Sequence, residues 1–466
     1  MPPSNGQEPD DTVNEKFKTA NGCLDYDVLI IGGGLSGIFS LYRIRELDLR
    51  VKVLEAGSSE GDTWFWNRYS GARFDSEKVL DEWNWTEHFS PQTETLRYIQ
   101  YLTKKFDLKK DMQFDTRILW AQFREDSTSW LLADSTGVTC TSRYLVTAMD
   151  ILNEPTLSNI SGVQDYKGKS WHTARWPSEG ANLEGKRVAV IGTGATGIQI
   201  IQEIAKTAGS LTVFQRTPNW TAPLRNTRIG PEEMAQIRQR HPETFQRCLD
   251  SPKGFIHFGD KRSVFDTEEL ERLEHWKTLY ALPGFAKVLS ISAYQRPRHR
   301  REAYSKNHGF GTRRVSLESG YHEAFNRPKR IADKGINTWE DEFEIDIILY
   351  ATGEGIRTFI GLTVKGFSNM FMIIIEYAVG WVADFLWYAR DRKLTFVEAT
   401  DEGMQHVWQC GEGLLPNEVD SWMTGINRNL AHKQKRSMTR YNGPAPGYRK
   451  RCDEAKAKGY SDFMLG

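Results

Sequence analysis

The clearest hydrophobic pattern in the 466-residue chain lies between residues 25 and 55. Tyr26–Ile31 is a short apolar run rich in β-branched residues, which is typical of a buried parallel strand. Ile38–Leu47 has apolar residues at helical spacing, and Val51–Leu54 is a second short apolar run. The order strand, helix, strand predicts a βαβ nucleotide-binding unit of an α/β protein.

Three glycines at GxGxxG spacing, Gly32, Gly34 and Gly37, connect this first strand to its helix. They allow a tight turn, close approach of the backbone to a pyrophosphate, and close packing of the helix on the strand. Glu55 ends the second strand, where a carboxylate can accept both hydroxyls of a ribose. The alternative is a chance glycine turn, but strand, helix and acid are all in register. We therefore predict a site for FAD or NAD rather than NADP.

The same pattern recurs about 160 residues later. Arg187–Ile191 and Leu211–Phe214 are short apolar runs that predict strands, and Ile198–Ala205 has helical spacing between them. The glycines of this second unit are Gly192, Gly194 and Gly197. The repeat predicts a second dinucleotide site.

The second unit ends in a base where the first ends in an acid. Gln215, Arg216 and Thr217 follow its second strand. A guanidinium can pair with a 2′-phosphate that a carboxylate would repel, so this site is predicted to bind NADP(H), with Thr196 and Gln199 as further cofactor contacts. The alternative is an arginine in a surface ion pair. Two sites of opposite ribose chemistry imply electron transfer from NADPH to a bound flavin, and hence an oxidoreductase.

Composition narrows the class of protein further. Basic and acidic residues both number 61, so no net charge favours nucleic acid or an acidic membrane. The five cysteines are scattered without a CxxC pair, which indicates a reducing compartment and predicts no metal site. Residues 1–23 are polar and acidic, so we expect a disordered leader, not a signal peptide, and a cytoplasmic protein.

Two segments raise alternatives that we do not favour. Met370–Ala389 is mostly apolar and about as long as a membrane span. Its polar positions Glu376, Gly380 and Asp384 fall four apart, which predicts a core-facing amphipathic helix. Arg296–Arg301 is basic, but a solvated face is favoured over a nucleic-acid patch. We further expect a helix at Thr95–Lys105 and strands at Ser129–Ala133, Tyr144–Ala148 and Ile345–Tyr350.

Two motifs next to these units carry a family resemblance. Thr63–Asp75 is an aromatic loop that could cover a flat ring system, or could simply pack on itself. Tyr166–Pro177 reads YKGKSWHTARWP and lies between the two units. They resemble the GGTWYWNRYPGARxD signature and the FxGxxxHxxxWP fingerprint of Baeyer–Villiger monooxygenases, with Tyr166 in place of Phe. The chain is similar to fungal members of that family from about Asp25 onward.

The resemblance implies a class B flavoprotein monooxygenase with two Rossmann-like domains that uses FAD, NADPH and O2. Such an enzyme inserts oxygen beside a ketone carbonyl to give an ester or a lactone, and the fungal likeness suggests secondary metabolism. Arg314, in a segment that resembles the family's active-site arginine segment, would stabilise negative charge on the flavin–oxygen adduct, with Asp75 beside it. The carried-over cofactor contacts are Thr63, Trp64, Arg216, Thr217 and Trp422, and the linker fingerprint is Gly168, His172, Trp176 and Pro177.

The chain also departs from the family pattern. Asp62 stands where the signature has Gly, which places a carboxylate near the FAD pyrophosphate. Ser70 replaces the signature Pro, Asp150 replaces a turn Gly, and Glu354 replaces an aromatic residue. Stretches look missing after Glu77 and after Ile373, and the segments 290–308 and 355–361 look short.

These observations predict four regions. We expect the leader at 1–23, an FAD domain at 24–162 and 351–466, an NADP domain at 165–222 and 313–350, and a helical insertion at 223–312. Three functions stay open: ketone oxygenation, N- or S-hydroxylation or NADPH oxidation on the same fold, and a truncated paralogue without activity. The oligomeric state and the identity of the ketone are left open.

Overall fold

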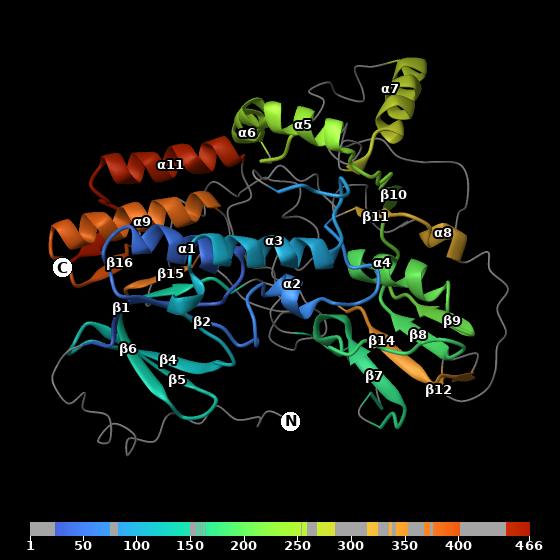
Figure 1. Cartoon of the computed structure of the whole chain (residues 1–466), viewed down its shortest axis with the longest axis horizontal. Helices are drawn as coiled ribbons and strands as arrows, with labels where there is room; N and C mark the ends of the chain where they lie inside the picture. Colours follow the sequence, from blue (N-terminus) through green and yellow to red (C-terminus); the bar gives the residue numbers. More distant parts are fainter. Residues whose placement is uncertain are drawn as a thin grey trace.

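The computed structural model of the protein contains two large sheets flanked by helices, one mixed and one entirely parallel (Figure 1). This arrangement confirms the predicted α/β class. The described residues are 24–74, 83–149, 155, 157, 160, 162–163, 165–252, 254–258, 268–284, 315–324, 335–337, 342–352, 368–372, 376–400 and 444–466.

The first sheet has seven strands, in the order β3-β2-β1-β6-β5-β4 with β15 also on β6. β1 pairs in parallel with β2 and β6, whereas β5 and β4 extend the sheet antiparallel. Val28, Leu29 and Ile30 at its centre are completely buried, as expected for a continuous apolar run. The strands are β1 (Tyr26–Ile31), β2 (Val51–Leu54), β3 (Met112–Gln113), β4 (Ile118–Arg124), β5 (Ser129–Asp134), β6 (Thr139–Thr147) and β15 (Met370–Met372).

Helices from both ends of the chain cover this sheet. α1 (Leu35–Arg45) lies beside α9 (Glu376–Asp391), and α11 (Ala445–Ala457) packs on the far side of α9 (Figure 1). Phe385 is completely buried and Trp381 is 4% exposed, so the apolar side of α9 belongs to the core, while Asp384 bonds Lys456 of α11 at 2.7 Å. Among the described helices, none combines the length and apolar character that a bilayer crossing requires.

The prediction of one helix over Met370–Ala389 was wrong at its start. Met370–Met372 forms β15 and pairs in parallel with residues 145–147 of β6. The helix begins only at Glu376. A short apolar run fits a strand and a helix equally well in sequence, and here the open edge of β6 decides between them.

The second sheet is a four-stranded parallel sheet in the order β7-β14-β8-β9, with α4 (Ala195–Ile204) packed on it. β14 lies between β7 and β8, although it follows β9 in the chain by more than 130 residues. The chain therefore leaves this sheet and returns to its centre. The strands are β7 (Lys169–His172), β8 (Arg187–Ile191), β9 (Ser210–Phe214) and β14 (Ile347–Tyr350).

The remaining described elements lie around these sheets. α5, α6 and α7 lie above α3 and α4 in Figure 1, within the region predicted as a helical insertion. The domain boundaries themselves stay a prediction. The remaining described elements are α2 (Thr63–Trp66), α3 (Gln92–Lys105), η2 (Lys109–Asp111), η3 (Thr173–Arg175), β10 (Thr221–Pro223), α5 (Pro231–Gln239), α6 (His241–Asp250), α7 (Glu269–Ala281), β11 (Ser316–Glu318), α8 (Tyr321–Ala324), β12 (Gly335–Asn337), β13 (Glu342–Glu344), β16 (Val397–Ala399) and β17 (Phe463–Leu465).

Candidate functional site

The first glycine turn, between β1 and α1, has the tight geometry that its sequence predicts. Gly32 has φ +109°, and a Cβ there would lie 2.8 Å from the carbonyl oxygen of Ala148. A Cβ at Gly37 would lie 1.9 Å from the carbonyl oxygen of Gly32. Both contacts are with backbone that cannot move aside, so only glycine fits at either position. The turn leaves the start of α1 without a side-chain cap.

Glu55 faces this turn from the end of β2. Its Oε2 accepts the N–H of Gly33 and its Oε1 accepts the N–H of Gly57, each at 2.6 Å. The residue is only 3% exposed, and burial raises the pKa of its carboxyl against the opposing effect of these two N–H groups. The two bonds hold the carboxylate at the strand end, the position where an acid meets a ribose in this type of fold.

The second glycine turn, between β8 and α4, repeats the first in detail. Gly192 also has φ +109°, and a Cβ there would lie 2.5 Å from the carbonyl oxygen of Ala351. A Cβ at Gly197 would lie 2.2 Å from the carbonyl oxygen of Gly192. The start of α4 likewise has no side-chain cap, and Thr196 lies in its first turn. The chain therefore contains two glycine cradles of the same backbone shape.

The strand ends differ between the two cradles. Gln215 follows β9 as Glu55 follows β2, and its Oε1 accepts the hydroxyl of Thr193 at 2.8 Å. Arg216 comes next and is exposed, with no hydrogen bond or ion pair to any described residue, and Thr217 is half-buried. The surface ion pair that was the alternative for Arg216 is thus not formed within the described part of the chain.

The predicted aromatic loop lies against the first cradle. The N–H of Gly61 donates to the carbonyl oxygen of Gly33 at 2.9 Å. A short helix, α2, begins at Thr63 inside the stretch expected to be loop. Trp64 packs on Phe74 with ring centroids 5.5 Å apart, and the amide of Gln92 on α3 donates to its carbonyl oxygen. These contacts hold the loop over the glycine turn.

The linker fingerprint is built around His172, which ends β7. Its Nδ1 accepts the N–H of Ala174 at 3.1 Å, so Nε2 carries the proton and donates to the carbonyl oxygen of Thr352 at 2.9 Å. Burial lowers the pKa of the imidazole, and the neutral ring joins the turn after β14 to η3. Both nitrogens are occupied by backbone groups, which fits a structural role and not that of a base.

Other fingerprint residues shape the same linker. Tyr166 lies over Gly168, where a Cβ would meet its hydroxyl at 2.2 Å, and this hydroxyl donates to the carbonyl oxygen of Ile345 at 2.8 Å. Trp176 is 5% exposed in the core beside α4, and the carbonyl oxygen of Pro177 accepts the N–H of Gly180. The hydroxyl that distinguishes Tyr166 from Phe is therefore satisfied.

The aromatic loop beside the first glycine turn also contacts the second nucleotide-binding unit and its linker, which the sequence did not predict. We call these two parts of the molecule its two halves. The guanidinium of Arg175 in η3 lies 4.7 Å from the ring of Trp66 in α2. Gln199 on α4 accepts the hydroxyl of Tyr69 at 2.8 Å and donates to the carbonyl oxygen of Arg73 at 3.1 Å. Gln199 thus contacts the aromatic loop, and its predicted contact with a cofactor stays a prediction. No periodicity marks such pairs, since they are 109 and 130 residues apart.

Several predicted residues lie outside the described residues. They are the candidate catalytic residues Arg314 and Asp75, the nicotinamide-ribose contact Trp422, and the departures Asp150 and Glu354. Their proposed roles rest on the sequence resemblance alone. Ser70, which replaces the signature Pro, is exposed.

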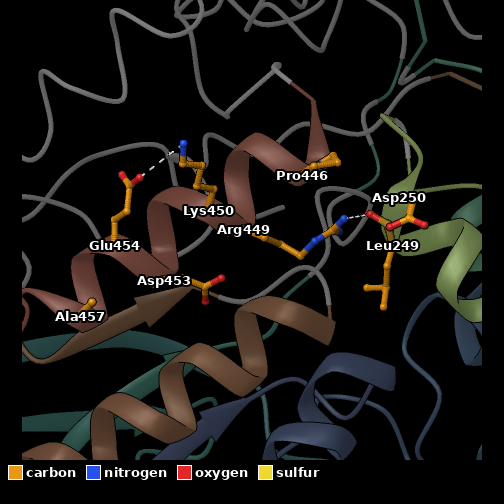
Figure 2. Close-up of a pocket in the computed structure, with 8 residues that line it drawn as sticks. All are labelled: Leu249, Asp250, Pro446, Arg449, Lys450, Asp453, Glu454 and Ala457. Carbon is orange, nitrogen blue, oxygen red and sulfur yellow. Dashed lines mark hydrogen bonds and ion pairs between the residues drawn. The ribbon is translucent and has the colours of Figure 1, made fainter.

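The open groove in Figure 2 lies between α11 and the end of α6, away from both glycine turns. Arg449 donates to the carbonyl oxygen of Leu249 across it, and Lys450 pairs with Glu454 at 3.9 Å along α11. None of its lining residues belongs to the predicted site, and we assign it no role. It is lined by Leu249, Asp250, Pro446, Arg449, Lys450, Asp453, Glu454 and Ala457.

Comparisons with known proteins agree on one class. A family model described as flavin-binding monooxygenase-like matches residues 26–252. Acetone monooxygenase (methyl acetate-forming) of Gordonia sp. is 31% identical, over 94% of this chain and 99% of that protein. 2-Oxo-Δ3-4,5,5-trimethylcyclopentenylacetyl-CoA monooxygenase of Pseudomonas putida is 30% identical, over 94% and 98%. The crystal structure of OTEMO in complex with FAD and NADP superposes with a TM-score of 0.86 at 29% identity, over 95% and 100%.

The two glycine cradles joined by the fingerprint, together with these relatives, define a flavin-binding monooxygenase built on two Rossmann-like domains. The chain belongs to the flavin-binding monooxygenase family and is homologous to its Baeyer–Villiger members. The predicted family, fold and enzyme class are thereby confirmed.

The alignment with the Pseudomonas putida relative also bears on the expected gaps. It spans 536 residues, whereas 94% of the 466-residue chain is about 438. Roughly 100 of its positions, the difference between 536 and 438, therefore have no residue of this chain. This excess is in line with the predicted missing stretches without locating them.

Proposed function

We propose that this chain is an FAD-dependent monooxygenase that uses NADPH and O2 to insert oxygen beside a ketone carbonyl, giving an ester or a lactone. The observation that carries the proposal is the pair of matching cradles with opposite strand ends, Glu55 at one and Arg216 at the other. Bound FAD supplies the oxygen chemistry and NADPH the reducing equivalents. A fungal secondary-metabolite ketone as substrate and a cytoplasmic location belong to this proposal.

The first cradle fits the ADP portion of FAD. Gly32 and Gly37 leave no room for a side chain, so the backbone N–H groups at the start of α1 stay accessible to phosphates. Glu55 holds its carboxylate at the strand end through Gly33 and Gly57, ready to accept ribose hydroxyls. These residues bind and orient the cofactor.

The second cradle fits NADPH. Arg216 is exposed beside the strand end, where it can pair bidentately with a 2′-phosphate, and Thr217 follows it. His172 bonds to the turn after β14, and Ala351 in this turn packs against Gly192 of the cradle. By resemblance, Arg314 is proposed to stabilise the negative charge that develops during oxygen transfer, with Asp75 beside this arginine and the flavin.

The first experiment is the visible spectrum of the purified protein before and after NADPH addition without oxygen. We expect flavin absorbance that bleaches with NADPH and returns with air. Cyclic and linear ketones should then accelerate NADPH oxidation and give a product heavier by one oxygen in mass spectrometry. A flavoprotein that oxidises amines or sulfides but no ketone, or that makes only peroxide, would replace the ketone assignment with one of the other flavin reactions.

The second candidate is a paralogue that has lost its activity. The observation that favours it is the roughly 100 alignment positions at which this chain has no residue. A folded protein that stays colourless after incubation with excess FAD would establish this candidate and remove the first.

A further inference from the structure

Asp62 occupies an unusual backbone position next to the first cradle. It has φ +43° and ψ −112°, in the region that favours glycine. It precedes α2, and its carbonyl oxygen accepts the N–H of Phe65 at 2.8 Å and that of Trp66 at 2.9 Å. The start of α2 thus holds Asp62 in a conformation that costs an L-residue free energy.

The side chain of Asp62 lies over the second glycine of the turn. A Cβ built at Gly34 would lie 3.0 Å from the Cβ of Asp62 and 3.3 Å from its Oδ2. Gly34 is the position at which the backbone approaches a pyrophosphate in this type of fold. The carboxylate therefore stands beside the place where the phosphates of a bound dinucleotide would lie.

The second cradle provides the internal comparison. Gly34 has φ −80° and ψ −175°, and its counterpart Gly194 has φ −73° and ψ −174°. Around a Cβ at Gly194, no atom of the described residues lies within 4 Å. The two backbones match. The difference between the surroundings of Gly34 and those of Gly194 therefore comes from the side chain of Asp62.

We propose that Asp62 limits the affinity of the first cradle for FAD, because its half-buried carboxylate repels the anionic pyrophosphate. This inference rests on the proposed function. The repulsion acts between like charges near the surface, so salt screens it in part. Flavin therefore binds more weakly, and is lost more readily, than it would with an uncharged residue at this position.

The test is a titration of the flavin-free protein with FAD at low and at high salt. Binding is monitored by the quenching of flavin fluorescence. Asp62→Asn removes the charge and keeps the shape, and Asp62→Gly removes the charge and the strained backbone. Asp48→Gly is the matched control, since Asp48 also has positive φ (+53°) but lies beyond the other end of α1. Circular dichroism and melting temperature establish that each variant folds.

We expect both Asp62 variants to bind FAD about tenfold more tightly than the original chain at low salt, and the difference to shrink at high salt. Asp62→Gly should also raise the melting temperature of the flavin-free protein by about 2 °C. Asp48→Gly should leave FAD affinity unchanged. If Asp62→Asn binds FAD as weakly as the original chain or more weakly, the inference about Asp62 is overturned, while the proposed function stands. If no folded variant binds FAD at all, the proposed function fails and the inference fails with it.

Discussion

The two glycine cradles share a backbone and differ in their side chains. Gly32 and Gly192 have the same φ of +109°, and in each cradle the third glycine abuts the carbonyl oxygen of the first. The first cradle ends in the buried carboxylate of Glu55, and the second ends in Gln215 followed by the exposed guanidinium of Arg216. We propose that the glycines set where a dinucleotide lies, whereas the charge at the strand end and beside the second glycine selects which dinucleotide binds.

Replacement of the third glycine of either GxGxxG motif should have the largest effect. In Gly197→Ala the added Cβ would lie 2.2 Å from the carbonyl oxygen of Gly192, so α4 must move away from β8. Such overpacking against backbone costs about 3 kcal/mol, and we expect NADPH affinity to fall more than 100-fold while flavin content is retained. Gly37→Ala should show the reverse, with flavin lost. NADPH titration and flavin content measure both variants, and equal loss of both cofactors in each would show that the cradles are not independent.

Removal of the guanidinium at the second strand end comes next. Arg216→Ala should weaken NADPH binding by about 2 kcal/mol, roughly 30-fold, because a bidentate charged pair with the 2′-phosphate is lost. NADH, which lacks this phosphate, should bind as before, so the ratio of the two dissociation constants is the decisive quantity. Lys206→Ala, which removes a base paired with Glu203 on the surface, serves as the control. An unchanged ratio in Arg216→Ala would refute the NADP assignment.

The pH dependence of stability should report on His172. Burial lowers its pKa in the folded protein, so the unfolded chain takes up a proton more readily below about pH 6.5. The folded protein should therefore lose about 1 kcal/mol as pH falls from 7.5 to 5.5, and His172→Asn should reduce this loss. Melting temperature across this range is the measurement. The same slope in both proteins would exclude His172 as the source.

The contact between the two halves should have the smallest effect. Arg175 stacks on Trp66 at 4.7 Å, and a half-buried pair of this kind contributes about 0.5–1 kcal/mol. Arg175→Met keeps the length of the side chain and removes the charge, so we expect unfolding to become easier by this amount. A double-mutant cycle with Trp66→Leu should return a coupling energy of similar size. Additive effects would show that the stack does not join the halves.

Three of the four strands of the two cradles were predicted to the residue, and the fourth, β9, begins one residue earlier than predicted, at Ser210. β1, β2 and β8 begin and end where their mainly apolar runs do, because a strand buried on both faces needs a largely apolar stretch. Helices were predicted less closely: α3 begins at Gln92 and not at Thr95, and α1 and α4 begin directly after the second glycine. Helix ends depend on caps and on neighbouring turns, which periodicity does not show.

Local pattern was thus sufficient for the two glycine turns and for the acid and the base that follow their second strands, while the cofactor assigned to each turn stays a prediction. These features need only neighbours within one βαβ unit, so their chemistry is written in consecutive residues. Tertiary packing decided the rest: β15 on the edge of β6, Gln199 bonded to Tyr69, and Arg175 against the ring of Trp66. Each of these joins segments that are distant in sequence, and burial and space, not spacing along the chain, determine which residues meet.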